Sequence, residues 1–423
     1  MYIDRRAFLR VGAGLLGLPM LHTVAASGAQ KIRGHVVVVG GGYAGATTAS
    51  YLRQWSDYNL NVTLVEPNSG FVSCPFSNLV IGGLKGIGDI SFSYGGLKKM
   101  GVRVVRDSVI ALEHDKRQVR LVGGDRLSYD RVVLAPGIDL MFDTVEGYDS
   151  KAQELIMHAW KAGPQTVKLR AQLESMPDGG VFAICIPRAP YRCPPAPYER
   201  ACLVADYFKR HKPKSKVIVL DANAEIQSKA RLFSKAWKEL YPGMVEYHPD
   251  SELLELDAKN KTAVLDFDQL KADVLNAVPQ QRAGTIARES GLKLINNRWV
   301  EMNWLTMESV NVPGVHVLGD ALFPSPRLPK SGHSANQLGK VTAAAILNLL
   351  AGVEPNAQAM LINTCYSFMS GESAAHISSV HKYDSTTGRY VKTAGGLSPA
   401  RNWLEVKIAH AWAKNIWSDT LAI

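Results

Sequence analysis

The fold is decided by the stretch Val36-Val37-Val38-Val39-Gly40-Gly41-Gly42-Tyr43-Ala44-Gly45. Four consecutive valines are typical of a strand that is buried in a parallel sheet. Gly40, Gly42 and Gly45 fit G-x-G-x-x-G, in which glycine permits a tight turn and lets the backbone approach a pyrophosphate. A helix is expected to follow as far as about Trp55, and its start would present free N–H groups to that ligand. The stretch therefore predicts a dinucleotide-binding unit of an α/β fold.

The strands that follow predict how the cofactor is held. A second strand, Val62–Val65, ends in Glu66, where a carboxylate would bind a ribose hydroxyl. NAD and FAD both use this arrangement, and more distant segments favour FAD. The strand expected within Tyr129–Gly137 ends in a small turn, as where a flavoprotein chain returns to its cofactor. The strand within Val315–Ala321 carries Asp320, which is placed to bind the ribityl or pyrophosphate part of FAD.

A long helix is a further feature that favours a flavin. The segment Pro329–Gln337 opens an Ala/Leu-rich helix that is expected to reach about Leu350. The dipole at its start would stabilise negative charge on a reduced flavin. Lys330 lies at that start, where its ammonium either counters charge on the flavin's pyrimidine edge or is a solvated surface group.

A second dinucleotide-type segment lacks its fingerprint. The strand expected at Gly180–Ile186 runs into Pro187–Pro195, where no G-x-G-x-x-G is present and proline removes N–H donors. The strand at Lys216–Asp221 indicates that the architecture is nevertheless kept. We therefore expect a two-dinucleotide-binding-domain flavoprotein, in which an FAD-binding Rossmann-like domain is joined to a degenerate NAD-type domain, and we expect that NADH is not the reductant.

The first residues predict export. Asp4–Arg10 is a twin-arginine block, the apolar run Val11–Leu21 is shorter than the roughly 20 residues that span a bilayer, and Ala25–Ala29 offers cleavage positions. The sequence thus predicts a periplasmic protein that is exported folded, with no transmembrane segment. The predicted parts are the signal, the first FAD segment, the degenerate domain, the second FAD segment and a C-terminal interface domain, with ranges 1–29, 30–150, 151–275, 276–350 and 351–423.

Composition excludes several classes of protein. At 423 residues and 46% hydrophobic content the chain can bury a large core. The net charge of +10 is spread along the chain without a run of five basic residues, which argues against nucleic-acid binding. No two of the five cysteines are spaced C-x-x-C, which excludes a thioredoxin pair, a zinc knuckle and c-type haem attachment. We therefore expect no metal site, and no haem in this chain.

Around three of the cysteines the chain resembles the flavoprotein subunit of flavocytochrome c sulfide dehydrogenase, and the resemblance extends over essentially the whole length. The stretches that carry it are Val39–Ala46, Glu66–Asn68, Cys74–Gly83, Tyr129–Arg131, His158–Gly163, Arg192–Ala201, His211–Val217, Gln281–Gly284, Pro329–Asn336, Asn363–Ser367 and Trp412–Ile416. The resemblance implies a periplasmic enzyme that oxidises sulfide and passes electrons through FAD to a separate c-type cytochrome subunit.

The resemblance also implies roles for single residues. Cys74 would be bonded covalently to the flavin 8α-methyl carbon. Cys193 and Cys365 would form a redox-active disulfide at the flavin, with Glu199 as a nearby acid/base. Ala196 departs from the family pattern, where glycine is common, and Pro187-Arg188 alters the preceding turn.

The chemistry of such a disulfide is ordinary thiol–disulfide exchange. Hydrosulfide would attack one sulfur, leaving a persulfide and a thiolate. Arg188 and Arg192 are expected to attract the anion and to favour the thiolate. Cys185 and Cys202 have no role in the family and are expected to be small buried hydrophobes. His333, at the helix start, is expected to be a polar neighbour of the flavin.

Two other functions are open from the sequence. A sulfide:quinone oxidoreductase at the membrane surface would share FAD and both redox cysteines, but it needs a quinone pocket and an amphipathic anchor. The stretch Trp403–Leu421 contains four charged residues and is expected to be a capping or partner-facing helix, although Trp403, Trp412 and Trp417 alone do not separate core, cytochrome interface and membrane contact. A non-catalytic flavin-binding homologue is the other possibility, and retention of the three cysteines argues against it.

Overall fold

The computed structural model describes residues 32–266 and 268–423, and residues 32–423 form one compact unit. The predicted export signal, 1–29, lies outside the described residues. Among the described helices, none has both the length and the apolar character that crossing a bilayer requires.

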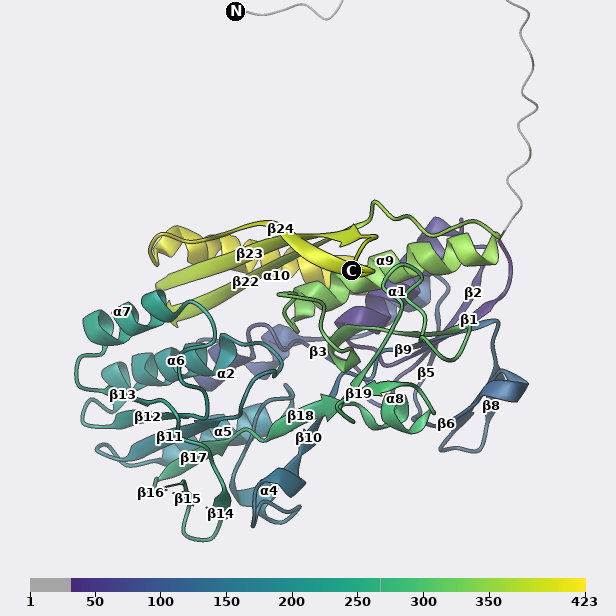
Figure 1. The fold of residues 1–423 in the computed structure, drawn as a ribbon. Helices are drawn as coiled ribbons and strands as arrows, with labels where there is room; N and C mark the ends of the chain where they lie inside the picture. Colours follow the sequence, from purple (N-terminus) through teal and green to yellow (C-terminus); the bar gives the residue numbers. More distant parts are fainter. Residues whose placement is uncertain (1–31, 267) are drawn as a thin grey trace, which may run out of the picture. The chain divides into compact units, whose positions relative to one another are not determined.

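The first parallel sheet is built around the valine run. Its strand order is β21 (Val315–Val317), β9 (Arg131–Leu134), β1 (His35–Val39), β2 (Asn61–Val65) and β5 (Arg103–Val105). Val36, Val37 and Val38 are completely buried, as expected for a central strand with both faces covered. Helices α1 (Tyr43–Trp55) and α9 (Gly332–Leu350) pack against each other beside this sheet (Figure 1). The predicted FAD-binding segments therefore form one sheet from two parts of the chain.

A second parallel sheet has the order β13 (Val245–His248), β12 (Lys216–Asp221), β11 (Val181–Ile186) and β17 (Val274–Ala277). Helices α5 (Pro164–Ser175), α6 (Ala196–His211) and α7 (Ala230–Leu240) accompany it. The antiparallel pair β10 (Ile138–Met141) and β18 (Gln280–Ala283) joins the regions of the two sheets. The predicted boundary at 275/276 falls inside β17.

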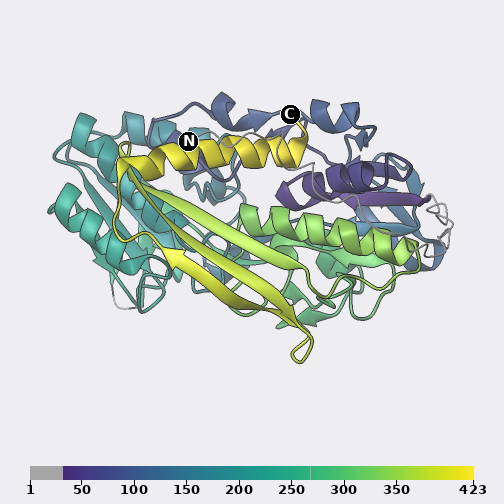
Figure 2. The same cartoon turned by 90° about the horizontal axis from the view of Figure 1, so that it is seen from above.

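The C-terminal part adds a third layer. Strands β22 (Met360–Ser370), β23 (Ser373–Asp384) and β24 (Arg389–Leu397) form an antiparallel sheet, and α10 (Trp403–Leu421) follows. Figure 2 shows this sheet and α10 lying alongside α9. Because β22 contacts both α9 and α6, this layer joins the two halves of the molecule.

The remaining elements are short and belong to loops or small meanders. They are β3 (Phe71–Val72), α2 (Ser77–Ile81), η2 (Ile87–Ile90), β4 (Ser91–Phe92), α3 (Gly95–Lys99), β6 (Val109–Glu113), η3 (His114–Lys116), β7 (Gln118–Leu121), β8 (Arg126–Ser128), η4 (Phe142–Thr144), α4 (Ala152–Leu155), β14 (Glu255–Asp257), β15 (Thr262–Val264), β16 (Gln269–Lys271), α8 (Thr285–Glu289), β19 (Leu294–Ile295), β20 (Trp299–Val300) and η5 (Gly319–Ala321).

Candidate active site

A cavity of about 860 Å³ opens at the carboxyl ends of the first sheet, which is the usual ligand position in open α/β folds. Its lining joins segments that are distant in sequence. They are the glycine turn 40–42, Glu66, Cys74, the turn 135–137, Arg192 and Asp320. The structure therefore brings the predicted cofactor-binding segments to one cavity.

Two glycines of the turn are required by close contacts with the protein backbone, whereas the third has open space beside it. A Cβ on Gly40 would lie 2.4 Å from the Ala135 carbonyl oxygen, and one on Gly45 would lie 1.9 Å from the Gly40 oxygen, so the protein's own backbone excludes side chains there. Around Gly42, by contrast, a Cβ would meet nothing within 4 Å. Gly42 is the N-cap of α1, which no side chain caps, and it borders the cavity. An open helix N-terminus facing a large cavity fits the pyrophosphate of FAD.

Two carboxylates stand at the wall of this cavity. Glu66 accepts hydrogen bonds from the Gly41 N–H at 2.7 Å and the Asn68 N–H at 2.9 Å, which fix its carboxylate beside the glycine turn. Asp320 lies in the turn after β21. Burial raises the pKa of Asp320, and the cation of Arg192 opposes that shift. Both residues thus line the large cavity, and their binding of FAD stays a prediction.

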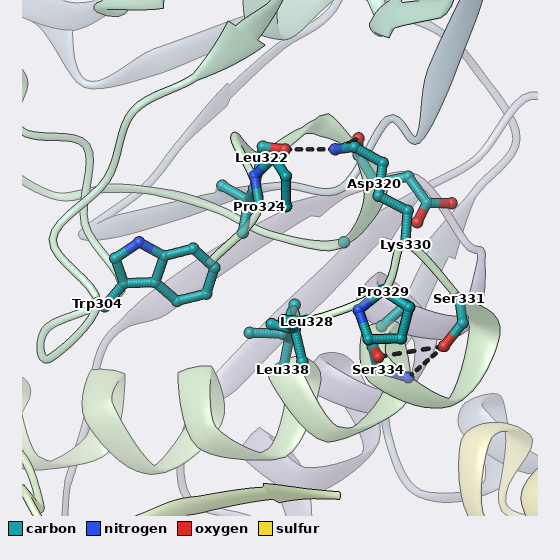
Figure 3. A pocket seen from close by; sticks show the side chains of 12 residues that line it. Trp304, Asp320, Leu322, Pro324, Leu328, Pro329, Lys330, Ser331, Ser334 and Leu338 are labelled. Carbon is teal, nitrogen blue, oxygen red and sulfur yellow. Dashed lines mark hydrogen bonds between the residues drawn. The ribbon is translucent and has the colours of Figure 1, made fainter. Parts of the chain in front are cut away.

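Lys330 is buried, and its predicted contact with the flavin stays a prediction. Its Nζ donates to the carbonyl oxygens of Asp320, at 2.9 Å, and Leu322. Figure 3 shows Lys330 beside these two residues. The Nζ also lies 3.7 Å from the ring centroid of Trp299. Burial lowers the pKa of Lys330 to about 7. The side chain lines a small neighbouring pocket that also contains Trp304, and it does not line the large cavity. It is therefore not a solvated surface lysine, and two main-chain carbonyls hold its ammonium.

A second, smaller cavity of about 90 Å³ contains the three cysteines that the resemblance singled out, Cys74, Cys193 and Cys365. They come from the loop before α2, the loop before α6 and strand β22. Cys74, Arg192 and Gly332 line both cavities, so the two cavities adjoin at these residues. Cys74 is therefore at the junction between the cofactor cavity and the thiol cavity.

All five cysteines are free thiols in the structure, and the Cys193–Cys365 bond stays a prediction. Cys193 has a left-handed backbone with a φ of 57°, and its N–H donates to the Lys330 carbonyl oxygen at 2.8 Å. Burial raises the pKa of Cys193, as do the neighbouring Cys365 and Glu199, whereas Arg192 opposes the shift. Cys185 and Cys202 are buried in the core, and Cys202 accepts a hydrogen bond from Trp237 Nε1 at 3.2 Å.

Glu199 lies in the first turn of α6 and lines the thiol cavity. Its carboxylate accepts from Asn78 Nδ2 and from the Phe368 N–H, each at 2.9 Å. Burial raises the pKa of Glu199, and these hydrogen bonds oppose the shift. A carboxyl group whose pKa is raised is suited to giving and taking a proton beside the thiols.

The two arginines that were expected to attract the substrate differ in position. Arg192 lines both cavities, and its Nη2 donates to the Trp160 carbonyl oxygen. Arg188 is exposed and forms an ion pair with Glu252 at 2.7 Å, and it lines neither cavity. The expectation for Arg188 is wrong, because this residue, five positions before Cys193 in sequence, points to the outer surface of the loop.

The histidine and the three tryptophans that the sequence analysis considered also differ in their positions. His333 lines the thiol cavity and accepts from the Thr364 N–H at 2.9 Å, while burial lowers its pKa to about 4. Trp412 lines the same cavity, Trp417 is buried, and Trp403 is 60% exposed. Of these three tryptophans, Trp403 is thus the most exposed.

Two buried cations near the thiols were not identified from the sequence. Arg200, next to Glu199, is 2% exposed and donates to Asn78 Oδ1, Asn276 Oδ1 and the main chain. Lys229 is 5% exposed and donates to Ser367 Oγ at 3.0 Å. Their partners lie far away in the chain, so no local pattern distinguishes them from surface residues.

Comparison with family models covers three parts of the chain. Residues 166–279 match the central part of the sulfide dehydrogenase (flavocytochrome c) flavoprotein chain. Residues 357–421 match the flavin-binding part of flavocytochrome c sulphide dehydrogenase, and residues 34–170 match pyridine nucleotide-disulphide oxidoreductase.

Individual relatives agree with these matches. The flavoprotein chain of sulfide dehydrogenase (flavocytochrome c) from Chlorobaculum thiosulfatiphilum is 64% identical over 45 residues, which is 11% of this chain and 92% of that sequence. Mitochondrial sulfide:quinone oxidoreductase of Dictyostelium discoideum is 25% identical over 67% of this chain, and the match spans 64% of that relative, just under two thirds of its length. The structure of sulfide:quinone oxidoreductase from Aquifex aeolicus superposes with a TM-score of 0.76 at 18% identity over 91% of each chain. The last likeness confirms the predicted fold class.

Proposed function

The chain belongs to the family of flavocytochrome c sulfide dehydrogenase flavoprotein chains, and from that premise we propose that it oxidises sulfide with FAD and passes the electrons to a c-type cytochrome subunit. One observation carries the proposal. Cys193, Cys365 and Glu199 share a small cavity that adjoins a dinucleotide-sized cavity at Cys74 and Arg192.

The chain's own residues supply the sulfur chemistry. In the oxidised state Cys193 and Cys365 would be bonded, and hydrosulfide, drawn in by Arg192, would attack one of the two sulfurs. The cysteine–cysteine bond breaks, a new sulfur–sulfur bond forms on the attacked cysteine, and the electron pair leaves on the other cysteine as a thiolate. Glu199 would take the proton of the bound HS group, because its raised pKa keeps it near the point of transfer.

The cofactor would be held by residues whose surroundings fit it. The N-terminus of α1 at Gly42, Glu66 and Asp320 would bind the dinucleotide part, and Cys74 would attach to the flavin. Bound FAD would supply a two-electron acceptor that can release its electrons one at a time. We also propose that nicotinamide nucleotides do not serve as the reductant of this flavin.

The second candidate is a sulfide:quinone oxidoreductase, which the Dictyostelium relative and the Aquifex fold both favour. The two candidate functions differ in the electron acceptor, which is a c-type cytochrome in one and a quinone in the other. We expect the purified holoprotein to reduce a c-type cytochrome with sulfide and to leave a soluble quinone analogue unreduced. Rapid reduction of the quinone without reduction of the cytochrome would show instead that the protein is a sulfide:quinone oxidoreductase.

Substitution tests the thiol pair. Cys193→Ser and Cys365→Ser should each abolish the bleaching of flavin by sulfide while the FAD spectrum remains. Cys202→Ser is the matched control, since its hydroxyl can accept the same hydrogen bond from Trp237, and it should retain full bleaching. Normal turnover in either active-site variant would refute the disulfide mechanism.

The place of action is part of the proposal. The Arg5-Arg6 pair supports export to the periplasm by the twin-arginine route. Replacing both arginines by lysine should leave the flavoprotein in the cytoplasmic fraction, whereas the unchanged sequence should deliver it to the periplasmic fraction. Delivery of both forms would count against this route.

A further inference from the structure

Asn78 connects the loop that carries Cys74 to the acid/base candidate Glu199. It lies in α2, shortly after Cys74, and is 5% exposed. Its side chain contacts Arg200 Nε at 3.0 Å, the Ala196 carbonyl oxygen at 3.0 Å and Glu199 Oε2 at 2.9 Å. Asn78 also lines the thiol cavity. The sulfur chemistry proposed above leaves this buried amide without a role.

Arg200 fixes which end of the Asn78 amide faces Glu199. The oxygen and the nitrogen of an amide have similar shapes, and their positions follow from the hydrogen bonds that they make. A guanidinium donates and never accepts, so the Asn78 atom that faces Arg200 Nε is the amide oxygen. The NH₂ group is then directed to the Ala196 carbonyl oxygen and to Glu199, which both accept. A reversed amide would face a donor with a donor and two acceptors with an acceptor.

Arg200 is itself held in one position. It is 2% exposed, and its Nη1 donates to the His158 carbonyl oxygen at 3.0 Å and to Asn276 Oδ1 at 2.7 Å. Its Nη2 donates to the Ala159 carbonyl oxygen at 2.8 Å. These three acceptors are neutral, and a buried cation is costly unless a negative charge compensates it. Arg200 thus orients the neighbouring amide and places a positive charge near Glu199.

The two oxygens of the Glu199 carboxylate each accept from a fixed donor. Oε1 accepts from the Phe368 N–H and Oε2 from Asn78 Nδ2, each at 2.9 Å. Donors that cannot become acceptors favour the charged carboxylate over the neutral carboxyl group. Glu199 lies in the first turn of α6, where the helix dipole also favours negative charge. These contacts oppose the rise in pKa that burial causes.

We propose that Asn78 and Arg200 are positioning residues that hold Glu199 as a base, ionised at pH 7 and ready to take a proton from the sulfur that enters the thiol cavity. When hydrosulfide has added to the disulfide, the S–H bond breaks and its electron pair remains on the terminal sulfur. The proton forms an O–H bond on Glu199. The inference rests on the proposed function, but its first test requires neither sulfide nor an electron acceptor.

Other titratable and charged groups surround Glu199 and act on it through space. Within the described residues they are the cations Arg192, Arg200 and Lys229 and the thiols Cys193, Cys202 and Cys365. Their influence does not depend on which way the Asn78 amide faces. The tests therefore use variants that keep these charges and change only the donor, or keep the charge of Arg200 and change only its shape.

The infrared band of the protonated Glu199 carboxyl group measures its titration directly, and its absence from Glu199→Gln assigns it. In the unchanged holoprotein, without sulfide, we expect the band to be absent at pH 7. Asn78→Leu fills a similar space but donates nothing, so the midpoint at which the band disappears should move upward by at least about one pH unit. A band that persists at pH 7 in the unchanged protein, or an unmoved midpoint in Asn78→Leu, would overturn the proposal.

Two further variants separate orientation from charge. Arg200→Lys keeps the charge but loses the planar fork, so the midpoint should again move upward. An unmoved midpoint would show that Arg200 acts through its charge alone and would refute its positioning role. Asn276→Leu is the matched control, because Asn276 is buried and its side-chain hydrogen bonds join Arg200, Met157 and His158. Its midpoint should stay unchanged, and a shift equal to that of Asn78→Leu would contradict a specific role for Asn78.

Asn78→Asp provides a second route if Asn78→Leu does not fold. It keeps the shape of the side chain and the acceptor for Arg200, but it replaces the donor with a carboxylate oxygen. Two carboxyl groups at this distance cannot both ionise readily, so the band should be present at pH 7. Adding Glu199→Gln to the same protein should remove the band. Absence of the band at pH 7 in Asn78→Asp would refute the role of Asn78.

Sulfide then tests the base in turnover. Bleaching of the flavin by sulfide in Asn78→Leu should be about tenfold slower than in the unchanged protein at pH 7 and should recover at higher pH, where Glu199 is again ionised. The ionisation of hydrogen sulfide is the same for both proteins, so the ratio of their rates reports on the protein. A ratio that does not change with pH would refute Glu199 as the group that Asn78 controls. If sulfide does not bleach the unchanged protein, the proposed function fails, while the infrared titration still decides the role of Asn78.

Discussion

At the scale of single residues, the glycines of the turn after β1 have two different functions. One is required by the packing of the protein backbone, and another leaves room for the cofactor. Gly45 is required by the protein, since a Cβ would meet the Gly40 oxygen at 1.9 Å. Gly42 has open space around its α-carbon and borders the cofactor cavity. The same residue type in one motif therefore serves two different purposes.

This difference predicts opposite outcomes for two small substitutions. Gly42→Ala should change the free energy of unfolding of the apoprotein by less than about 0.5 kcal/mol but weaken FAD binding. Gly45→Ala should cost about 1–3 kcal/mol of stability, because its new methyl group has no room. Denaturant titration and quenching of flavin fluorescence, both in a Cys74→Ala background, measure the two effects. Equal destabilisation by both variants would contradict the assignment.

Cys74 gives the second prediction at this scale. Its place at the junction of the two cavities leads us to expect that FAD stays bound to it after denaturation. Acid precipitation should leave the yellow colour in the pellet of the unchanged protein. In Cys74→Ala the colour should pass to the supernatant, with some FAD still bound before denaturation. Release of all flavin from the unchanged protein would show that no covalent bond forms.

At the scale of elements, α10 is anchored to the cofactor cavity through Trp417. The indole Nε1 lies 3.0 Å from both Tyr43 Oη and Ser73 Oγ, and the ring packs on Phe92 at 4.8 Å between centroids. Tyr43 in turn lines the cavity. This helix, which was expected to be a capping or partner-facing helix, thus supports the wall of the site.

Trp417→Phe should remove this anchor while keeping an aromatic ring. The hydroxyl groups of Tyr43 and Ser73 lose a buried donor, so we expect a loss of about 1–3 kcal/mol in the free energy of unfolding. Trp403→Phe is the control on the same helix, because Trp403 is 60% exposed, and its effect should be within about 0.5 kcal/mol. Denaturant unfolding followed by circular dichroism compares them.

The loop between β11 and α6 yields a prediction about the reductant. The N–H groups of Ala189, Arg192 and Cys193 donate to Asn223, Gln281 and Lys330, so they are not available to a pyrophosphate. Stopped-flow mixing with NADH should therefore leave the flavin oxidised on the timescale of turnover. Sulfide added to the same sample should bleach it, which shows that the sample is active. Fast bleaching by NADH would reopen the class of nicotinamide-dependent reductases.

Elements with a strong local sequence pattern could be predicted. A strand that buries polar residues and exposes apolar ones could not. Strand β12 and helices α9 and α10 have the bounds expected from sequence, because apolar runs and helix periodicity define them. Strands β22–β24 were not identified. In β22 the buried positions include Asn363 and Ser367, while Met360 and Ile362 are about half exposed. This inverts the pattern by which a strand is normally recognised.

At the scale of the whole molecule, the site is assembled from three regions. Cys193 comes from the loop after the second sheet's first strand, Cys365 from the third layer and Cys74 from the first sheet's connection. Sequence motifs and the family resemblance placed these residues. Lys229 and Arg200 could not be placed in the same way, because their burial results from contacts between regions that are distant in sequence.

Two buried histidines predict how stability responds to acid. Burial lowers the pKa of His158 to about 3 and that of His316 to about 4, against about 6.5 in an unfolded chain. Both are neutral in the folded protein and take up protons on unfolding, so their contribution is fully present above pH 6.5 and is lost as the pH falls towards 4. The slope is about 1.4 kcal/mol per pH unit for each histidine.

Denaturant unfolding at pH 7.5, 6.0 and 5.0 measures this loss. Glu199 and Asp320, whose pKa values are raised, act in the opposite direction, so a single variant isolates the histidine contribution. His158→Asn keeps an acceptor for the Trp160 N–H but does not titrate. Its stability should fall less steeply than that of the unchanged protein between pH 6 and 5. Parallel curves would contradict the assignment.

The anchoring of α10 also fixes an order of events during biosynthesis. Asn336 of α9 donates to Thr47 of α1 and to Thr420, and Trp417 donates to Tyr43 beside the glycine turn. A nascent chain can form the first sheet early, but it cannot complete this wall until residue 420 has left the ribosome. Stable loading of the cofactor would therefore require that α10 has docked, so that retention of the flavin colour would report the closing of this wall.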